Sequence, residues 1–160
     1  MSRRTGLTIP LLVLFVVLFV ACGSEAPRGE LPSAPELMRL LAAGSGPNVA
    51  VTEDTAHDPR LRPRTYPVRP SELARAAERA IQGLPRWEVQ GGRAGVIWAT
   101  RRTRGFGFVD DVYLLLLPAR DSTVVYARSA SRAGWSDFGQ NRRNLGELWD
   151  ALDRTVTSEQ

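Results

Sequence analysis

Apolar and polar residues alternate along the second half of the chain, as they do in half-buried β-strands. In the segment 96–102 the even-numbered side chains face one way and the odd-numbered ones the other. The segment 111–117 is almost continuously apolar, which is typical of a central strand. The expected strands are residues 87–90, 96–102, 111–117 and 124–132. Gly91 and Gly92 supply a turn signal after the first of them, so we expect a four-stranded antiparallel meander.

Helical spacing of apolar residues appears on both sides of these strands. After Pro70, an apolar stripe consists of Leu73, Ala76, Ala77, Ala80, Ile81 and Leu84. A final helix, which Asp137 can cap, presents Phe138, Asn141, Leu145, Leu148, Trp149 and Leu152 on one side. Two helices on one face of an antiparallel sheet predict an α+β fold with two layers.

The N-terminal half is less regular. Ser33 and Glu36 have the spacing of a capping box and open a short helix. Residues 48–70 contain four prolines and predict an extended, Pro-rich N-terminal strap that lies on the domain. The expected segments are a signal peptide (1–21), a flexible tether (22–35), a short helix and loop (36–47), the α+β domain (48–155) and a disordered tail (156–160).

The first 22 residues have the layout of a bacterial secretory signal. Arg3 and Arg4 precede an apolar run from Leu7 to Val20, which is short for a helix that crosses a membrane. The residues 19–22 read Phe-Val-Ala-Cys and resemble the lipobox of bacterial lipoproteins, which are cleaved just before the cysteine. An uncleaved anchor helix and a plain secretory signal are the alternatives.

The lipobox resemblance gives the single cysteine a role. A secreted disulfide protein needs paired cysteines, whereas Cys22 alone can carry diacylglycerol on its sulfur and a fatty acyl chain, such as palmitate, on its amine. The resemblance therefore implies a lipid-anchored protein of the cell envelope. Gly23 follows the cysteine, which in a Gram-negative cell favours the outer membrane, with the domain facing the periplasm.

The composition limits the classes of partner and cofactor that we expect. All 21 basic residues are arginines and the net charge is +4. No basic run with interleaved aromatic residues indicates a nucleic-acid surface. His57 is the only histidine and lies in the strap, without a second histidine or a nearby cysteine to complete a metal or catalytic site. We expect no nucleic acid, metal or cofactor.

Polar residues gather at one end of the expected sheet. If Leu117 lies opposite Val124, Arg128 comes close to Asp111 on one face, while Ser129 and Ser131 turn to the other face with Asp110. Arg102 joins Asp111 if the second strand pairs beside it. The expected polar cluster is Arg102, Asp110, Asp111, Arg128, Arg132, Asp137 and Asn141.

Three interpretations of this cluster remain open. Arg–Asp pairs can act as a structural clasp between the hairpin and the last helix. Alternatively, a small anionic or carboxylate ligand binds there, through Arg128, Arg132, Arg142 and Ser131. The third interpretation is a hydrolase in which Asp110 and Asp111 act as acid and base, although adjacent strand residues point to opposite faces.

The two stretches 105–112 and 128–143 resemble the signature of domain-of-unknown-function family 1499, and the resemblance extends over about residues 48–152. The family includes secreted and lipid-anchored bacterial proteins, and it implies no activity. Members often carry Asn-Cys-Val-Ser near their start, where residues 48–51 here read Asn-Val-Ala-Val. We therefore expect a lipid-anchored binding or scaffold module rather than an enzyme, with the membrane and an envelope protein or a small anion as partners.

Overall fold

The computed structural model describes residues 29–159, and the expected signal peptide and the first half of the expected tether, with Cys22, lie outside them. One six-stranded sheet runs in the order β1-β6-β5-β4-β3, with β2 also paired to β6. The elements are α1 (Ala34–Ala42), β1 (Val49–Val51), the short 3-10 helix η1 (Pro59–Leu61), β2 (Arg64–Tyr66), α2 (Pro70–Gln82), β3 (Trp87–Arg93), β4 (Val96–Arg102), β5 (Val109–Ala119), β6 (Ser122–Ser131) and α3 (Gln140–Ser158).

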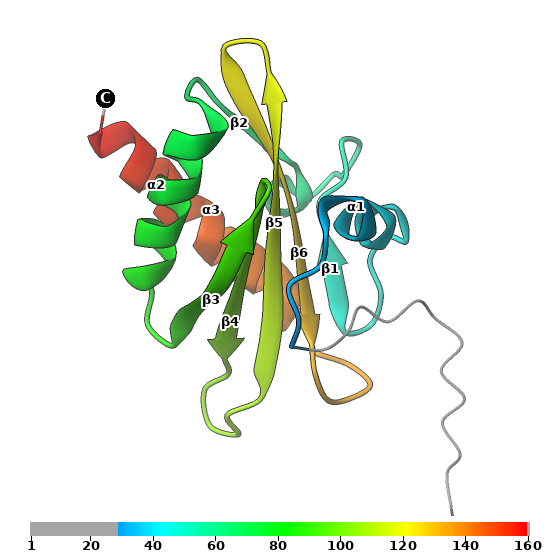
Figure 1. Ribbon diagram of the computed structural model, residues 1–160. Helices are drawn as coiled ribbons and strands as arrows, with labels where there is room; N and C mark the ends of the chain where they lie inside the picture. Colours follow the sequence, from blue (N-terminus) through cyan, green and yellow to red (C-terminus); the bar gives the residue numbers. More distant parts are fainter. Residues whose placement is uncertain (1–28, 160) are drawn as a thin grey trace, which may run out of the picture.

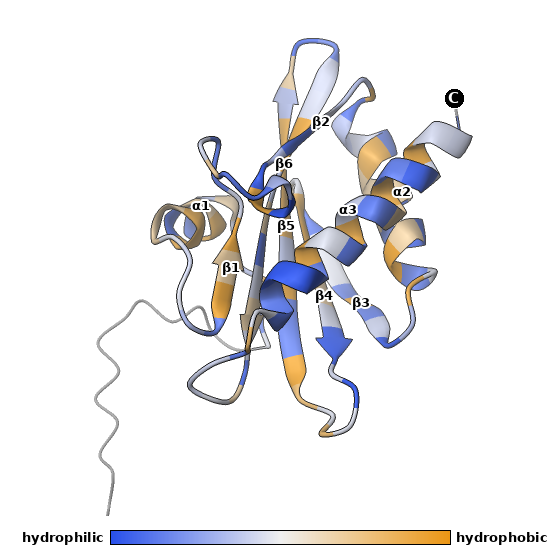
Figure 2. Ribbon diagram, turned by 180° about the vertical axis from the view of Figure 1, so that it is seen from behind, coloured by the Kyte–Doolittle hydropathy of each residue, from blue (hydrophilic) through white to orange (hydrophobic). Residues whose placement is uncertain are grey.

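The α+β class and the antiparallel arrangement of β3 to β6 agree with the sequence analysis. Helices α2 and α3 pack side by side on one face of the sheet (Figures 1 and 2). The alanines of α2 let it approach closely, and Leu145, Leu148 and Leu152 of α3 are fully buried against the same core. This is the larger of the two apolar cores.

The strap, residues 48–70, does more than lie over the domain as the prolines predict, because it adds two strands to the sheet. Both of its strands pair antiparallel with β6: β1 along residues 128–130 and β2 along residues 123–125. Two three-residue strands thus complete one edge of the sheet, whose backbone groups would otherwise be unpaired. The expected sheet of four strands is therefore too small by two.

The short first helix covers the opposite face of the sheet (Figure 1). Its capping box forms as expected, with the amide of Ser33 donating to Oε2 of Glu36 over 2.8 Å. Leu37 and Leu40 are buried against Tyr113 and Leu115 of β5. The helix begins at Ala34, inside the segment expected to be tether, and forms a third layer of the domain.

The predicted turn at Gly91-Gly92 is wrong. These glycines lie within β3, where the register shifts between Val89 and Gly91. The turn falls instead at Ala94-Gly95, which both have positive φ, as two-residue hairpin turns require. A side chain at Gly95 would come within 2.9 Å of the Leu116 carbonyl oxygen, so glycine is needed there.

Residues 156–158 belong to a helix, although the sequence predicts a disordered tail from residue 156. Helix α3 continues to Ser158 because Val156 is buried in the main core. Glu159 then accepts three hydrogen bonds from Nε and Nη2 of Arg79 on α2. The expected domain limit at residue 155 therefore lies about one turn too early.

Candidate functional site

The register of the β5–β6 hairpin matches the prediction. Leu117 pairs with Val124, and Tyr113 with Arg128, around the two-residue turn Arg120-Asp121. Strand alternation consequently places Asp110 and Asp111 on opposite faces of the sheet. The polar cluster expected from the sequence is divided into two separate groups.

The first group lies between the sheet and the start of α3, and we name it the amide ring: Asp110, Ser129, Ser131, Asn141 and Asn144. Its side chains form a closed cycle of hydrogen bonds. The five bonds run from Ser131 Oγ to Asp110 Oδ1 (2.7 Å), from Asn144 Nδ2 to Asp110 Oδ2 (2.9 Å) and to Ser129 Oγ (3.0 Å), from Ser129 Oγ to Asn141 Oδ1 (2.6 Å), and from Asn141 Nδ2 to Ser131 Oγ (3.0 Å).

Four of the five side chains of the amide ring are buried, Ser131 is half-buried, and all of the side-chain donors are used. Asp110, Ser129, Asn141 and Asn144 are each at most 1% exposed. The second amide hydrogen of Asn141 goes to the Asn48 carbonyl oxygen, which ties the strap to the ring. A satisfied network of this kind fixes the position of a helix on a sheet.

Asp137 fixes the start of α3, as the sequence analysis expects. Its carboxylate accepts hydrogen bonds from the amides of Gly139 and Asn141. These bonds satisfy amides that have no partner within the helix. Phe138, which was expected on the buried side of this helix, lies before it and is 89% exposed. The helix begins only at Gln140.

The second group lies on the opposite face, and we name it the arginine cluster: Trp98, Asp111, Tyr113, Arg128 and Arg132. Arg132 donates to both oxygens of Asp111, over 2.8 Å from Nε and 2.7 Å from Nη2. The Trp98 indole donates to the same carboxylate over 2.8 Å. The hydrogen bond with Asp111 raises the pKa of Arg132, which stays charged.

Arg128 is the least satisfied member of the arginine cluster. Its side chain is buried, and its Nε has no hydrogen-bond partner within residues 29–159. Burial lowers the pKa of this guanidinium. Within residues 29–159, Asp111 forms its ion pair with Arg132, and the Arg128 guanidinium has no ion pair of its own.

The start of the described chain lies against the arginine cluster. The Tyr113 hydroxyl donates to the Glu30 carbonyl oxygen over 3.2 Å. A Cβ atom at Gly29 would lie 3.4 Å from Nη2 of Arg132. Residues 29–31 therefore run directly over this face, next to Arg132.

Two expected members of the cluster lie elsewhere. Arg102 pairs with Val109 and is exposed, while Thr100 takes the place opposite Asp111. The prediction for Arg102 is wrong by two residues because the six-residue link after β4 leaves the register open. Arg142 lies on α3 with its Nε 3.5 Å from Asp58, and Ser131 belongs to the amide ring. Of the four expected ligand residues, only Arg128 and Arg132 share a face.

Several residues of both groups were missed by the sequence analysis. Asn144 follows Asn141 by three positions, and this helical spacing could have identified it. Trp98 and Tyr113 were assigned only to the apolar pattern, yet each uses its polar atom. Arg101, opposite Asp110, is 5% exposed, with Nη2 3.5 Å from Oε1 of Glu147; nothing in the strand pattern distinguished it from a surface arginine.

The geometry removes the basis of the hydrolase interpretation. Asp110 and Asp111 lie on opposite faces, and each is fully engaged by its own neighbours. An acid and a base that act on one substrate must reach the same cleft. Within residues 29–159, no three His, Cys, Asp or Glu side chains are grouped closely enough to hold a metal ion.

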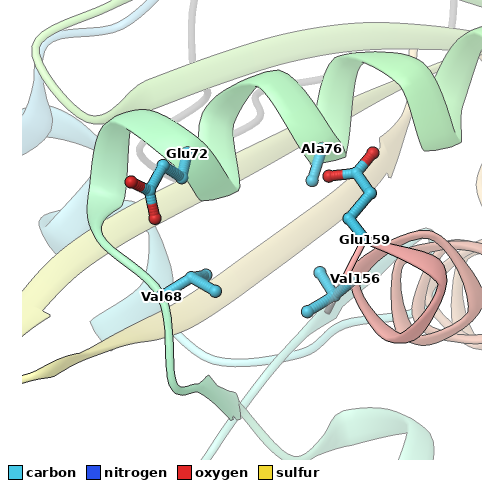
Figure 3. Close-up of a pocket in the computed structure, with 5 residues that line it drawn as sticks. All are labelled: Val68, Glu72, Ala76, Val156 and Glu159. Atoms are coloured by element: carbon cyan, nitrogen blue, oxygen red, sulfur yellow. The ribbon is translucent and has the colours of Figure 1, made fainter.

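A pocket of about 160 Å³ lies apart from both groups, between α2 and the end of α3 (Figure 3). It is lined by Val68, Glu72, Ala76, Val156 and Glu159. Glu159 is already bound to Arg79. The pocket contains no residue of the amide ring or of the arginine cluster, so it gives neither group a ligand cavity.

Most of the domain matches a known sequence family. The family model described as "Protein of unknown function (DUF1499)" matches residues 40–152. The chain belongs to this family. The match includes β1 to β6 and most of α3, and therefore all of the amide ring and the arginine cluster. A search of curated proteins finds no match.

Solved structures resemble the DUF1499 chain only loosely. TTHA0849 from Thermus thermophilus is 12% identical with a TM-score of 0.37, and it covers 69% of this chain and 98% of its own. CalU16 from Micromonospora echinospora is 15% identical with a TM-score of 0.38, and the match covers 70% of this chain and 87% of CalU16. LpqN, described as involved in cell envelope biogenesis of Mycobacterium tuberculosis, is 12% identical with a TM-score of 0.31, covering 78% and 79%. At these scores the similarities carry no functional argument.

No helix within residues 29–159 has both the length and the apolar character needed to cross a membrane.

Proposed function

We propose that this DUF1499 protein is a lipid-anchored protein of the bacterial cell envelope, attached through Cys22, and that its domain is a binding or scaffold module. The observation that carries the second part is the closure of the amide ring. Its polar groups are spent on one another and on the backbone, which leaves no free acid, base or nucleophile there.

The anchor is supported by sequence layout. The apolar run 7–20 ends two residues before the only cysteine of the chain, and a tether rich in Gly, Ser, Pro and Glu follows. Two acyl chains on one residue suffice for stable attachment, because each buried methylene contributes about 0.8 kcal/mol. In a Gram-negative cell the domain then faces the periplasm from the outer membrane.

Mass spectrometry of the protein purified from membranes tests the anchor. The expected N-terminal fragment begins at Cys22 and carries a diacylglycerol group and an additional acyl chain. The matched variant Cys22→Ser is expected to keep its signal segment and to lose the lipid mass. A wild-type chain that retains residues 1–21 and an unmodified Cys22 contradicts the proposal.

The binding activity has one specific candidate, a small anion held by the arginine cluster. The observation that favours it is the unpartnered Nε of the buried Arg128 next to Arg132. A carboxylate or phosphate offers the acceptor oxygens that a guanidinium recognises. The segment 29–31 lies over this face, so binding requires the anion to enter beside it or to displace it.

Thermal unfolding in the presence of phosphate, acetate and citrate tests this candidate. A ligand at about 100 times its Kd stabilises the folded state by about 2.7 kcal/mol. The stabilisation is expected to disappear in Arg128→Met and to persist in Arg142→Gln, since Arg142 lies beside Asp58 on α3. Equal responses of the two variants, or none in the wild-type protein, eliminate the anion site.

A further inference from the structure

Large apolar side chains are exposed in two loops of the domain. Phe106 and Phe108, in the β4–β5 loop, are 87% and 51% exposed, and their rings stack on each other at 5.8 Å. Trp135 and Phe138, in the β6–α3 loop, are 76% and 89% exposed. Within residues 29–159 the one other large apolar side chain with comparable exposure is Met38. We name residues 103–108 and 132–139 the aromatic loops.

Both aromatic loops lie at the same end of the sheet (Figure 1). Strand β4 ends there, β5 begins there and β6 ends there, because all three are antiparallel neighbours. The amide of Arg132 donates to the Val109 carbonyl oxygen over 3.0 Å, which joins the bases of the two loops. The exposed aromatic residues therefore form part of one surface rather than scattered positions.

The described chain starts beside this same end. Gly29 lies next to Arg132, at the base of the second aromatic loop. Only six residues separate Gly29 from Cys22. A fully extended chain of this length reaches about 25 Å, so a domain anchored at Cys22 must keep this end close to the bilayer. This step rests on the proposed lipid anchor.

The charge around the aromatic loops complements an anionic surface. Arg102 directly precedes the first loop, Arg104 lies within it, and both are exposed. Of the acidic residues nearby, Asp111 binds Arg132 and Asp137 caps α3, while Glu30 is exposed. Bacterial anionic headgroups attract arginines near the membrane surface, and aromatic rings favour the same headgroup level.

From these observations we infer that the aromatic loops dock on the lipid bilayer, inserting Phe106, Trp135 and Phe138 at the headgroup level while Arg102 and Arg104 meet anionic lipids. The lipid at Cys22 supplies attachment, and the loops set orientation. The docked domain stands with the β5–β6 turn away from the membrane, so that α1, α2 and α3 stay accessible to an envelope partner.

Tryptophan quenching in vesicles tests the docking with the full chain. Residues 1–28 contain no tryptophan, and of the four in the chain only Trp135 is exposed. Protein purified from membranes is reconstituted into vesicles that contain phosphatidylglycerol and a phosphatidylcholine whose acyl chains are brominated. We expect the bromines to quench Trp135 and the quenched component to vanish in Trp135→Phe. In Trp135→Phe/Asp121→Trp, which moves the fluorophore to the far end, we expect no quenching.

The outcomes separate docking from anchoring. Mass spectrometry on the same preparation reports the state of Cys22. A lipidated Cys22 with an unquenched Trp135 overturns docking and leaves the anchor intact. An unmodified Cys22 overturns both. If the loops instead pair two copies of the chain, Phe106→Cys forms intermolecular crosslinks and Trp135 stays unquenched, which also overturns docking.

Arginine variants test the electrostatic part. Each arginine near an anionic surface is worth about a fivefold change in the ratio of docked to undocked protein. Arg102→Gln and Arg104→Gln are expected to lower this ratio in vesicles with phosphatidylglycerol and to leave it unchanged without it. The control Arg120→Gln, at the β5–β6 turn, is expected to have no effect. Loss of equal size for all three variants contradicts this orientation.

Discussion

Asp110 of the amide ring and Asp111 of the arginine cluster are adjacent in the sequence, but their side chains have different partners and their clusters differ in exposure. Asp110 meets only a hydroxyl and an amide and is 1% exposed. Asp111, on the other face, meets Arg132, whose side chain is 35% exposed, and the Trp98 indole. The carboxylate of Asp110 binds Asn144 and so fixes α3 on the sheet. The carboxylate of Asp111 binds Arg132, next to Gly29 at the start of the described chain.

The difference shows that a dense polar motif need not be one site. The strand period separates neighbouring residues by the thickness of the sheet, and each face then acquires its own partners. The donors of the amide ring are all used within the ring and by the strap, whereas Arg132 of the arginine cluster is partly exposed and the Nε of Arg128 has no partner within residues 29–159. An unpartnered guanidinium nitrogen does not by itself distinguish the two faces, because Nε and Nη1 of Arg101, opposite Asp110, also lack a partner there.

The largest effect is expected from Asp110→Ala. It removes the acceptor of the buried Asn144 amide and of the half-buried Ser131 hydroxyl, and an unsatisfied buried group costs about 1–3 kcal/mol. We expect a loss of about 3 kcal/mol in the free energy of unfolding, measured by urea denaturation. The matched variant Asp111→Ala is expected to lose less, because water can reach Arg132. Equal losses for the two variants refute the distinction between the two faces.

A double-mutant cycle between Asp111 and Arg132 measures the next effect. With Asp111→Asn and Arg132→Gln, we expect a coupling energy of about 1 kcal/mol, the upper end for a partly exposed pair, because the contact is bidentate. The coupling should shrink in high salt. A salt-independent coupling indicates that the pair is sealed like the amide ring.

Removing one hydroxyl group tests the link between the arginine cluster and the start of the described chain. Tyr113→Phe loses the hydrogen bond to the Glu30 carbonyl oxygen, at about 0.5–1.5 kcal/mol. Hydrogen exchange is expected to speed up across residues 29–33 and to stay unchanged at Asn141 and Asn144. Faster exchange in the amide ring as well means that the two faces are not independent.

The smallest expected effect is a loss of stability that appears only at alkaline pH, when buried tyrosines ionise. Burial raises the pKa of Tyr113, and of Tyr66, above the ordinary value of about 10. Their contribution to stability is therefore complete below about pH 10 and is lost as pH rises towards the folded-state pKa. The fall in the urea midpoint above pH 10 should be reduced in Tyr113→Phe and retained in Asn144→Ala. An unchanged fall in Tyr113→Phe contradicts this assignment.

Local signals predicted much of the fold. The predicted pairing of Leu117 with Val124 and the strand alternation around it gave the β5–β6 register, and with it the separation of Asp110 from Asp111. The glycine pair at 91–92 misled the turn assignment, because glycine is also typical of a β-bulge. Strands β1 and β2 were missed since three residues carry too little pattern among prolines.

The sequence alone determined which residues alternate, where α1 and α3 are capped and which family the chain resembles, because these depend on neighbours within a few positions. The tertiary structure decided which residues become partners across long separations. Asn144 meets Asp110 over 34 positions, Asn141 meets Asn48 over 93, and Tyr113 meets Glu30 over 83. These contacts depend on how α3, the strap and the first described residues pack on the sheet, and packing is a property of surfaces that no local pattern contains.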